Sequence, residues 1–252
     1  MVIRNALVVP IRIDLLAVHT DTRTAGPLAD FSGLPWHDGR RDVNAGRPHL
    51  AAEIADVPFE APASRLPTGV HLHWALPAAL TRGRHRPRGD TPEPAVAVAS
   101  IDFPRVPNRW LVDAPDGWWV VESDHLHPEG ADAAATAVSY LLPPEERRRL
   151  GARAPFRFVG RQVPLRDWRP RDQGAEHLHG LTAVGWGHPA FHAYHPNCRS
   201  VFGFHHDTAD PDAGSRHPYR VLGWYSNLAH DPVAALAAAR RDLDADGLAA
   251  EL

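Results

Sequence analysis

The stretch NRWLVDAPDGWWVVE, residues 108–122, decides the fold class. Two runs rich in β-branched and aromatic residues, 108–113 and 117–122, flank the segment Ala114-Pro115-Asp116-Gly117. Such runs are typical of strands, and a short glycine-containing segment between them is typical of a hairpin. The stretch therefore predicts two neighbouring antiparallel strands joined by a tight turn.

Further strand-like runs extend this pattern along the chain. Ile11, Ile13 and Leu15 alternate with polar residues, which indicates a half-buried strand within 6–18. The chain contains 25 prolines and 19 glycines, too many for long helices. We predict a β-rich α+β fold with many short, mostly antiparallel strands, long loops and further strands at 69–75, 95–103, 156–163, 200–205 and 219–226.

Helical patterns are few and short. The alanine-rich residues 131–142 predict a short helix. The segment PPEERRRL, residues 143–150, predicts one or two turns, because its acids come first and its arginines last. Near the C-terminus, Asp231 suits an N-cap, Pro232 suits the first helical position, and VAALAAARRDL follows.

The length of 252 residues favours one large domain or two small ones. We expect a single β-rich domain over residues 1–230, with a loop-rich insertion at 20–68. The C-terminal helix, within 231–252, would follow this domain.

Composition excludes several classes of function. All 27 basic residues are arginine, so neither a Schiff-base lysine nor a phosphate-loop lysine exists. The formal net charge of -3 offers no basic field for nucleic acid. Cys198 is the single cysteine, which excludes an intrachain disulfide and a zinc site built from cysteines.

The N-terminal run is apolar, but Arg4, Pro10, Arg12 and Asp14 interrupt it. It lacks the pattern of a cleaved signal peptide and is too polar to span a bilayer. We therefore expect no membrane insertion. The protein would be cytoplasmic, or exported without a classical signal peptide.

Histidine is the most unusual feature of the sequence, with 17 residues. His-Leu-His occurs three times, at 71–73, 125–127 and 177–179. Alternate residues of a strand share a face, and neutral imidazole is the commonest metal ligand. In HLHPE, residues 125–129, Glu129 supplies a carboxylate beside two histidines. This combination suits a two-histidine, one-carboxylate site for iron or another divalent transition metal. The candidate metal ligands are His71, His73, His125, His127, Glu129 and His205.

The alternative is that these histidines are hydrogen-bonded structural residues. Asn108, Arg109 and Trp110 form a candidate structural group, in which the guanidinium stacks on the indole and binds carbonyls. His71 and His73 would then lie against this group as hydrogen-bonding partners in a polar core.

Trp118 and Trp119 are adjacent on a predicted strand and therefore face opposite ways. Only one of them belongs in the core of a one-sided sheet. The other is a candidate for an exposed or interface aromatic.

Four segments, taken as a set, resemble the N-terminal region of large uncharacterised bacterial proteins. Some of those proteins are encoded near phage-tail-like or contractile-injection clusters, and they extend beyond the length of this chain. The resemblance implies no activity to carry across, and it covers most of residues 1–230. Its segments are TGVHLHWALPAALTRG (68–83), FPRVPNRWLV (103–112), PFRFVGRQVPLRDW (155–168) and LTAVGWGHPAFHAYHPNCRSVFGFHHD (181–207).

Three functions follow from these observations. The first is a non-enzymatic structural or protein-interaction module of a larger bacterial assembly, with a protein partner and no cofactor. One face of the terminal helix, with Val233, Leu236 and Arg240, would be a docking element. The second is a metal-dependent enzyme with a histidine-rich site on strands, for an unknown small-molecule substrate. The third is a carbohydrate-binding module, which needs two or more exposed tryptophans on one surface. We expect the first.

Overall fold

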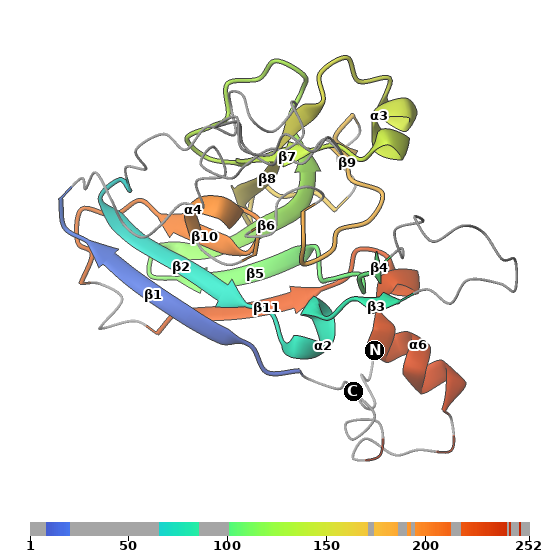
Figure 1. The fold of residues 1–252 in the computed structure, drawn as a ribbon. Coiled ribbons are helices and arrows are strands. Elements are labelled where there is room, and N and C mark those ends of the chain that lie inside the picture. The colour runs from blue at the N-terminus through green and yellow to red at the C-terminus, as the bar shows by residue number, and fades with distance from the viewer. Residues whose placement is uncertain are drawn as a thin grey trace, which may run out of the picture.

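The computed structural model is built from antiparallel sheets joined by long connections (Figure 1). It describes residues 9–20, 66–85, 101–170, 174–185, 191–192, 195–212, 218–240, 242 and 247. Its strands are β1 (Arg12–Val18), β2 (Gly69–Ala75), β3 (Arg84–His85), β4 (Ile101–Asp102), β5 (Arg109–Ala114), β6 (Gly117–Leu126), β7 (Val138–Leu141), β8 (Phe156–Pro164), β9 (Glu176–His177), β10 (Gly203–His206) and β11 (Arg220–Trp224). Its helices are α2 (Ala78–Thr81), α3 (Pro144–Leu150), α4 (His195–Cys198), the 3₁₀ helix η1 (Leu228–His230) and α6 (Pro232–Ala239).

The strands form two main sheets. One is three-stranded in the order β1-β2-β10, and the other runs β11-β5-β6-β8-β7, with β9 also paired to β6. The strands β3 and β4 make a separate small pair. Each pairing is antiparallel. The prediction of a β-rich α+β fold is confirmed.

The hairpin predicted at 108–122 joins the two central strands of the larger sheet. Ala114 pairs with Gly117 at the turn, and Arg109 pairs with Glu122 at the open end. Gly117 has a φ of +130°, a conformation that side chains other than glycine rarely adopt. The turn sequence therefore sets the register of the whole hairpin.

Two helices begin as predicted. The Asp231 carboxylate accepts hydrogen bonds from the backbone N–H groups of Val233 and Ala234, at 2.9 and 3.2 Å, and so caps α6. The segment 143–150 forms α3, which ends at Gly151 in the left-handed conformation. None of the helices in the described ranges has the length and apolar character that a membrane crossing requires.

The helix predicted at 131–142 is wrong. Turns occupy its first part, and Val138–Leu141 forms strand β7, which pairs with β8. Val138 and Tyr140 are buried against the sheet, so cross-strand pairing overrides the helical preference of the alanines. The proposed insertion at 20–68 lies almost wholly outside the described residues, as do residues 95–100 of the expected strand 95–103.

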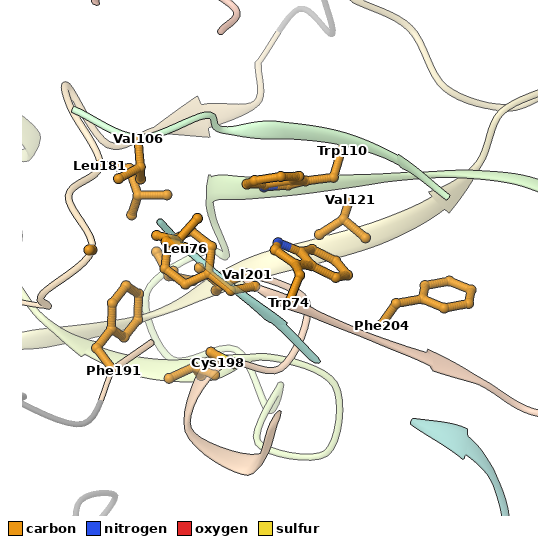
Figure 2. Packing of buried hydrophobic residues seen from close by; sticks show 14 of the residues in the cluster. Trp74, Leu76, Val106, Trp110, Val121, Leu181, Phe191, Cys198, Val201 and Phe204 are labelled. Carbon is orange, nitrogen blue, oxygen red and sulfur yellow. The ribbon is translucent and has the colours of Figure 1, made fainter. Parts of the chain in front are cut away.

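The main apolar core lies between the two sheets. Trp74 of β2 packs against Trp110 of β5, with ring centroids 5.2 Å apart (Figure 2). Phe204 of β10 packs against Trp119 of β6 at 5.6 Å. Strand alternation explains this arrangement, since Trp110 pairs with Val121 on the face of β5 and β6 that meets β2.

The polar turn of the hairpin also joins the sheets. Asp116 accepts a hydrogen bond from Trp119 Nε1 at 3.0 Å and lies 3.3 Å from His206 Nε2 of β10. The other ring nitrogen of His206 is 2.7 Å from the Tyr219 hydroxyl. Burial, with Asp116 nearby, raises the pKa of Tyr219 to about 12, so this phenol stays protonated and donates to the ring.

The two core tryptophans make a matched test of this packing. Trp110 Nε1 donates to Ser123 Oγ at 2.9 Å, whereas Trp74 Nε1 is buried without a hydrogen-bond partner in the described part of the chain. We expect Trp110→Phe to lower the free energy of unfolding by about 1 kcal/mol more than Trp74→Phe, because only the first substitution breaks a buried hydrogen bond. Urea unfolding of both variants measures the difference, and equal losses would contradict it.

Candidate metal centre

The outer face of the larger sheet, opposite the apolar core, carries a row of polar and aromatic side chains. Trp224 of β11, Arg109 of β5, Glu122 of β6 and Arg161 of β8 are successive cross-strand neighbours. The Glu122 side chain is only 2% exposed. A carboxylate buried this deeply requires charged or hydrogen-bonding partners.

Both oxygens of Glu122 have partners. Oε1 lies 3.2 Å from Arg109 Nε and accepts a hydrogen bond from Trp168 Nε1 at 3.1 Å. Oε2 accepts a hydrogen bond from Arg161 Nε. Burial alone would raise the pKa of Glu122, but His177, Arg109, Trp168 and Arg161 together hold it far below its usual range. Glu122 is therefore an anion at any physiological pH.

A second carboxylate completes this ionic cluster. Asp124 accepts hydrogen bonds from Arg109 Nη1 and, at 2.6 Å, from Asn108 Nδ2. The side-chain Oδ1 of Asn108 accepts from the backbone N–H of Ser226 at 2.8 Å. Arg109 thus turns toward two carboxylates and the backbone carbonyl of Asn108 rather than stacking on Trp110, whose side chain lies on the core face. The expected stack fails because neighbouring residues of a strand point to opposite faces.

The cluster borders a group of possible metal ligands. One ligand atom each from Glu122, His125 and His177 lies within 4.8 Å of the others. Two backbone features bring them together. The pairing of β6 with β8 is irregular between Glu122 and Leu126, and β9 places His177 directly across from His125.

Two imidazole nitrogens in this group lack partners. In the described part of the chain, neither His125 Nδ1 nor His177 Nε2 has a hydrogen-bond partner, although both atoms are buried. His177 Nε2 is 3.9 Å from Glu122 Oε1, which is longer than a hydrogen bond. Burial lowers the pKa of His125 to about 3, and the charge of Arg161 adds to this effect. His125 is therefore neutral at pH 7 and able to bind a metal ion.

The other residues of the HLHPE segment have different partners. His127 Nε2 donates to the Gly160 carbonyl at 2.8 Å. Glu129 is exposed, and its oxygens accept from the backbone N–H groups of Arg153 and Ala154 at 3.1 and 2.9 Å. These N–H groups lower the pKa of Glu129. The carboxylate that lies beside His125 is therefore Glu122, three residues before it, and not Glu129.

The histidines of β2 and β10 lie in the other sheet. His71 and His205 are cross-strand neighbours whose rings stack with centroids 4.4 Å apart. His205 Nε2 donates to the Thr68 carbonyl at 3.1 Å, and His73 Nε2 donates to the His192 carbonyl at 2.8 Å. Burial lowers the pKa of both His73 and His205. These histidines hold backbone segments, and they are not part of the Glu122 group.

Six of the eight tryptophans lie within the described ranges, and Trp36 and Trp186 do not. Trp118 is 46% exposed, whereas its neighbour Trp119 is partly buried against Phe204. Of these six, Trp118 alone is exposed. The described residues therefore do not provide the pair of exposed rings that a carbohydrate-binding surface needs.

Cys198 has no role in this site. Its thiol is fully buried, and burial raises its pKa far above the usual range.

No protein-family model, curated protein or solved structure matches this chain at a significant level. The candidate centre therefore rests on its own geometry.

The buried carboxylate gives a direct stability prediction. We expect Glu122→Gln to lower the free energy of unfolding by about 3–5 kcal/mol, because it removes the buried negative charge that both Arg109 and Arg161 contact. Glu129→Gln is the control and should cost far less, since that side chain is exposed. Urea unfolding at pH 7 provides the comparison.

The same residue predicts a pH dependence. The pKa of Glu122 is lower in the folded protein than its unfolded value of 4.5, so the unfolded chain binds a proton first as pH falls. The stability that Glu122 contributes is complete above about pH 4.5 and is lost progressively below it. The free energies of unfolding of the wild type and of Glu122→Gln, measured at several pH values from 7 to 3, should approach each other as the pH falls. A constant difference would argue against a depressed pKa.

Proposed function

We propose that this protein binds one divalent transition-metal ion through Glu122, His125 and His177. The observation that carries the proposal is the pair of buried imidazole nitrogens, His125 Nδ1 and His177 Nε2, which have no hydrogen-bond partner among the described residues and lie beside an ionised carboxylate. A buried polar atom without a partner costs free energy, and a metal ion would satisfy both nitrogens at once.

The donor set suits such an ion. Two imidazoles and one carboxylate are typical ligands of iron, zinc and related divalent ions. Metal–nitrogen and metal–oxygen bonds of about 2.0–2.2 Å require the three ligand atoms to move somewhat closer than they now lie. Because His125 is neutral at pH 7, protons would compete with the metal only weakly at that ligand.

The arginines determine how Glu122 would take part. Oε1 is the oxygen nearest His177 Nε2, so it is the atom that would bind the metal. The ion would compete there with Arg109 and Trp168, while Oε2 would keep its contact with Arg161. Glu122 would then bridge the metal and a guanidinium, which lowers the affinity but fixes the orientation of the carboxylate.

Three protein ligands would leave a coordination position for water or for a substrate oxygen. A metal ion with such an open position polarises a carbonyl group or activates a bound water. His177, whose side chain is 27% exposed, is the ligand nearest to solvent. Access for a substrate would therefore be from the β9 side, and metal-dependent catalysis would take place there.

Metal titration tests this proposal. Tag-free protein treated with chelator should bind about one equivalent of Co²⁺ or Zn²⁺, and the metal should raise the melting temperature because it binds only the folded state. His177→Ala should abolish binding, which is measured by the visible absorption of Co²⁺ and by calorimetry.

His179→Ala is the matched control, since His179 is exposed and lies two residues away. It should bind the metal as the wild type does. Binding that survives His177→Ala, or an absence of binding to the wild type, would refute the proposal.

A protein-interaction role is a second candidate, and the exposure of two elements supports it. Leu15 and Leu16 of β1, the edge strand of the smaller sheet among the described residues, are 48% and 45% exposed, and α6 contains no buried residue. Edge strands accept a further strand from a partner. The resemblance to large bacterial proteins encoded near phage-tail-like clusters favours a partner protein in a larger assembly.

Site-specific crosslinking tests the second candidate. A photoreactive residue at position 16, introduced in the cell that makes this protein, should crosslink to a single partner. The same residue at position 165, where Leu165 is 40% exposed, is the control. Equal crosslinking from both positions would argue against β1 as an interface.

A further inference from the structure

The two buried imidazoles His71 and His195 form a chain of contacts that joins α4 to β2. His71 Nε2 lies 2.8 Å from the Pro67 carbonyl oxygen, and His71 Nδ1 lies 3.1 Å from His195 Nε2. His195 Nδ1 lies 3.1 Å from the Leu72 carbonyl oxygen. The chain therefore runs from one carbonyl to another through both rings, and each ring uses both nitrogens.

These three contacts need more protons than two neutral rings possess. A carbonyl oxygen only accepts, so His71 Nε2 and His195 Nδ1 must each carry a proton. A neutral imidazole carries one proton, which leaves the two facing nitrogens with a lone pair each. All three contacts become hydrogen bonds only when a third proton lies between His71 Nδ1 and His195 Nε2.

We propose that His71 and His195 bind a single proton between them in acid solution, and that this proton completes the hydrogen-bonded chain between α4 and β2. The pair is then one imidazole and one imidazolium that share a charge. The proposal is independent of the metal site, which lies in the other sheet.

The backbone leaves room for this pair. A side chain on Gly203 of β10 would place its Cβ 2.6 Å from His195 Nδ1 and 2.9 Å from the Leu72 carbonyl. Gly69 has the same relation to His205, whose Nε2 would lie 2.8 Å from an added Cβ. The absence of a side chain at both positions allows the histidine rings to contact the strands.

The surroundings determine when the proton binds. His205 of β10 stacks on His71, Arg199 follows α4, and both disfavour a further positive charge. Cys198 of α4 is a buried neutral thiol. On β1, Leu16 lies opposite His71, and Asp14 lies 3.9 Å from His73; directly after β10, Asp207 favours a positive charge on His205.

Burial and the positive charge of Arg199 keep both rings uncharged near pH 7. Burial is the main cause that lowers the pKa of His71 to about 4, and it holds the pKa of His195 well below its ordinary value. At pH 7 the central contact therefore lacks its proton, and acid supplies it. Because the unfolded rings bind protons near pH 6.5, their effect on stability is a loss as pH falls from 6.5 towards 4.

Nitrogen NMR of the whole protein, labelled with ¹⁵N-histidine, tests the proton count. At pH 7.5 we expect His71 protonated at Nε2 and His195 protonated at Nδ1, with both facing nitrogens unprotonated. On acidification the ¹⁵N signals of the two facing nitrogens should shift together, and the change should correspond to one bound proton per pair. A proton on His195 Nε2 at pH 7.5, or independent protonation of the two rings, would overturn the proposal.

Two variants of one residue separate the proton from the packing. In His195→Gln the amide N–H takes the place of Nε2 and donates to His71 Nδ1 without any added proton. In His195→Asn the amide reaches only the Leu72 carbonyl. Neither replacement side chain titrates, so we expect both variants to lose the coupled shift, and their melting temperatures should fall less than that of the wild type between pH 6.5 and pH 4.

A metal ion is the competing occupant, and the same spectra distinguish it. Addition of chelator should leave the His71 and His195 signals unchanged, since no third ligand from the described residues joins this pair. A shift of both facing nitrogens on chelation would overturn the proposal. So would a melting temperature that falls as steeply between pH 6.5 and pH 4 in both variants as in the wild type.

Discussion

The structure depends on a carboxylate that is placed where water cannot reach it. Glu122 occupies the centre of the larger sheet, and its charge is balanced by guanidinium groups from the strands on either side, Arg109 of β5 and Arg161 of β8. Asp124 balances Arg109 in turn. Because a buried charge is tolerated only with partners, this register of three strands is favoured over any shifted one.

The same constraint accounts for the contrast between the two groups of histidines. In and beside the smaller sheet, four imidazoles contact backbone carbonyls and so link segments: His71, His73, His195 and His205. Beside Glu122, where the pairing of β6 with β8 is irregular, two ring nitrogens have no such link within the described part of the chain. Histidines of similar sequence context therefore have different chemistry, and His-Leu-His alone does not indicate which.

Much of the fold was predictable because it depends on local pattern. Apolar alternation, the turn at 114–117 and the cap at Asp231 each determine an element from adjacent residues, and the structure contains all three. The segment 138–141 was not predictable in this way, because its strand forms only against β8. Trp118 and Trp119 followed the alternation rule, whereas the supposed stack of Arg109 on Trp110 ignored it.

The candidate site was predictable only in part. His125 carries a sequence signal in its triplet, and so does His177, but their meeting depends on the pairing of β9 with β6. Glu122 was missed because it lies in an apolar run and not beside a histidine. Its position opposite Arg109 in a predicted hairpin is the signal that would have found it, since an acid facing an arginine across a pair of strands indicates a buried ion pair.

The connectivity of the smaller sheet has a consequence for the speed of folding. The hairpin of β5 and β6 joins neighbours in the chain, whereas Thr68 and His205, which meet beside β2, are separated by 137 positions. Closing so long a loop costs entropy before any contact rewards it, so distant strands pair slowly. We expect the β5–β6 hairpin to form first. The two strands that pair with distant partners, β10 with β2 and β11 with β5, would then join last, and their partners' edges would be exposed longest in a newly made chain.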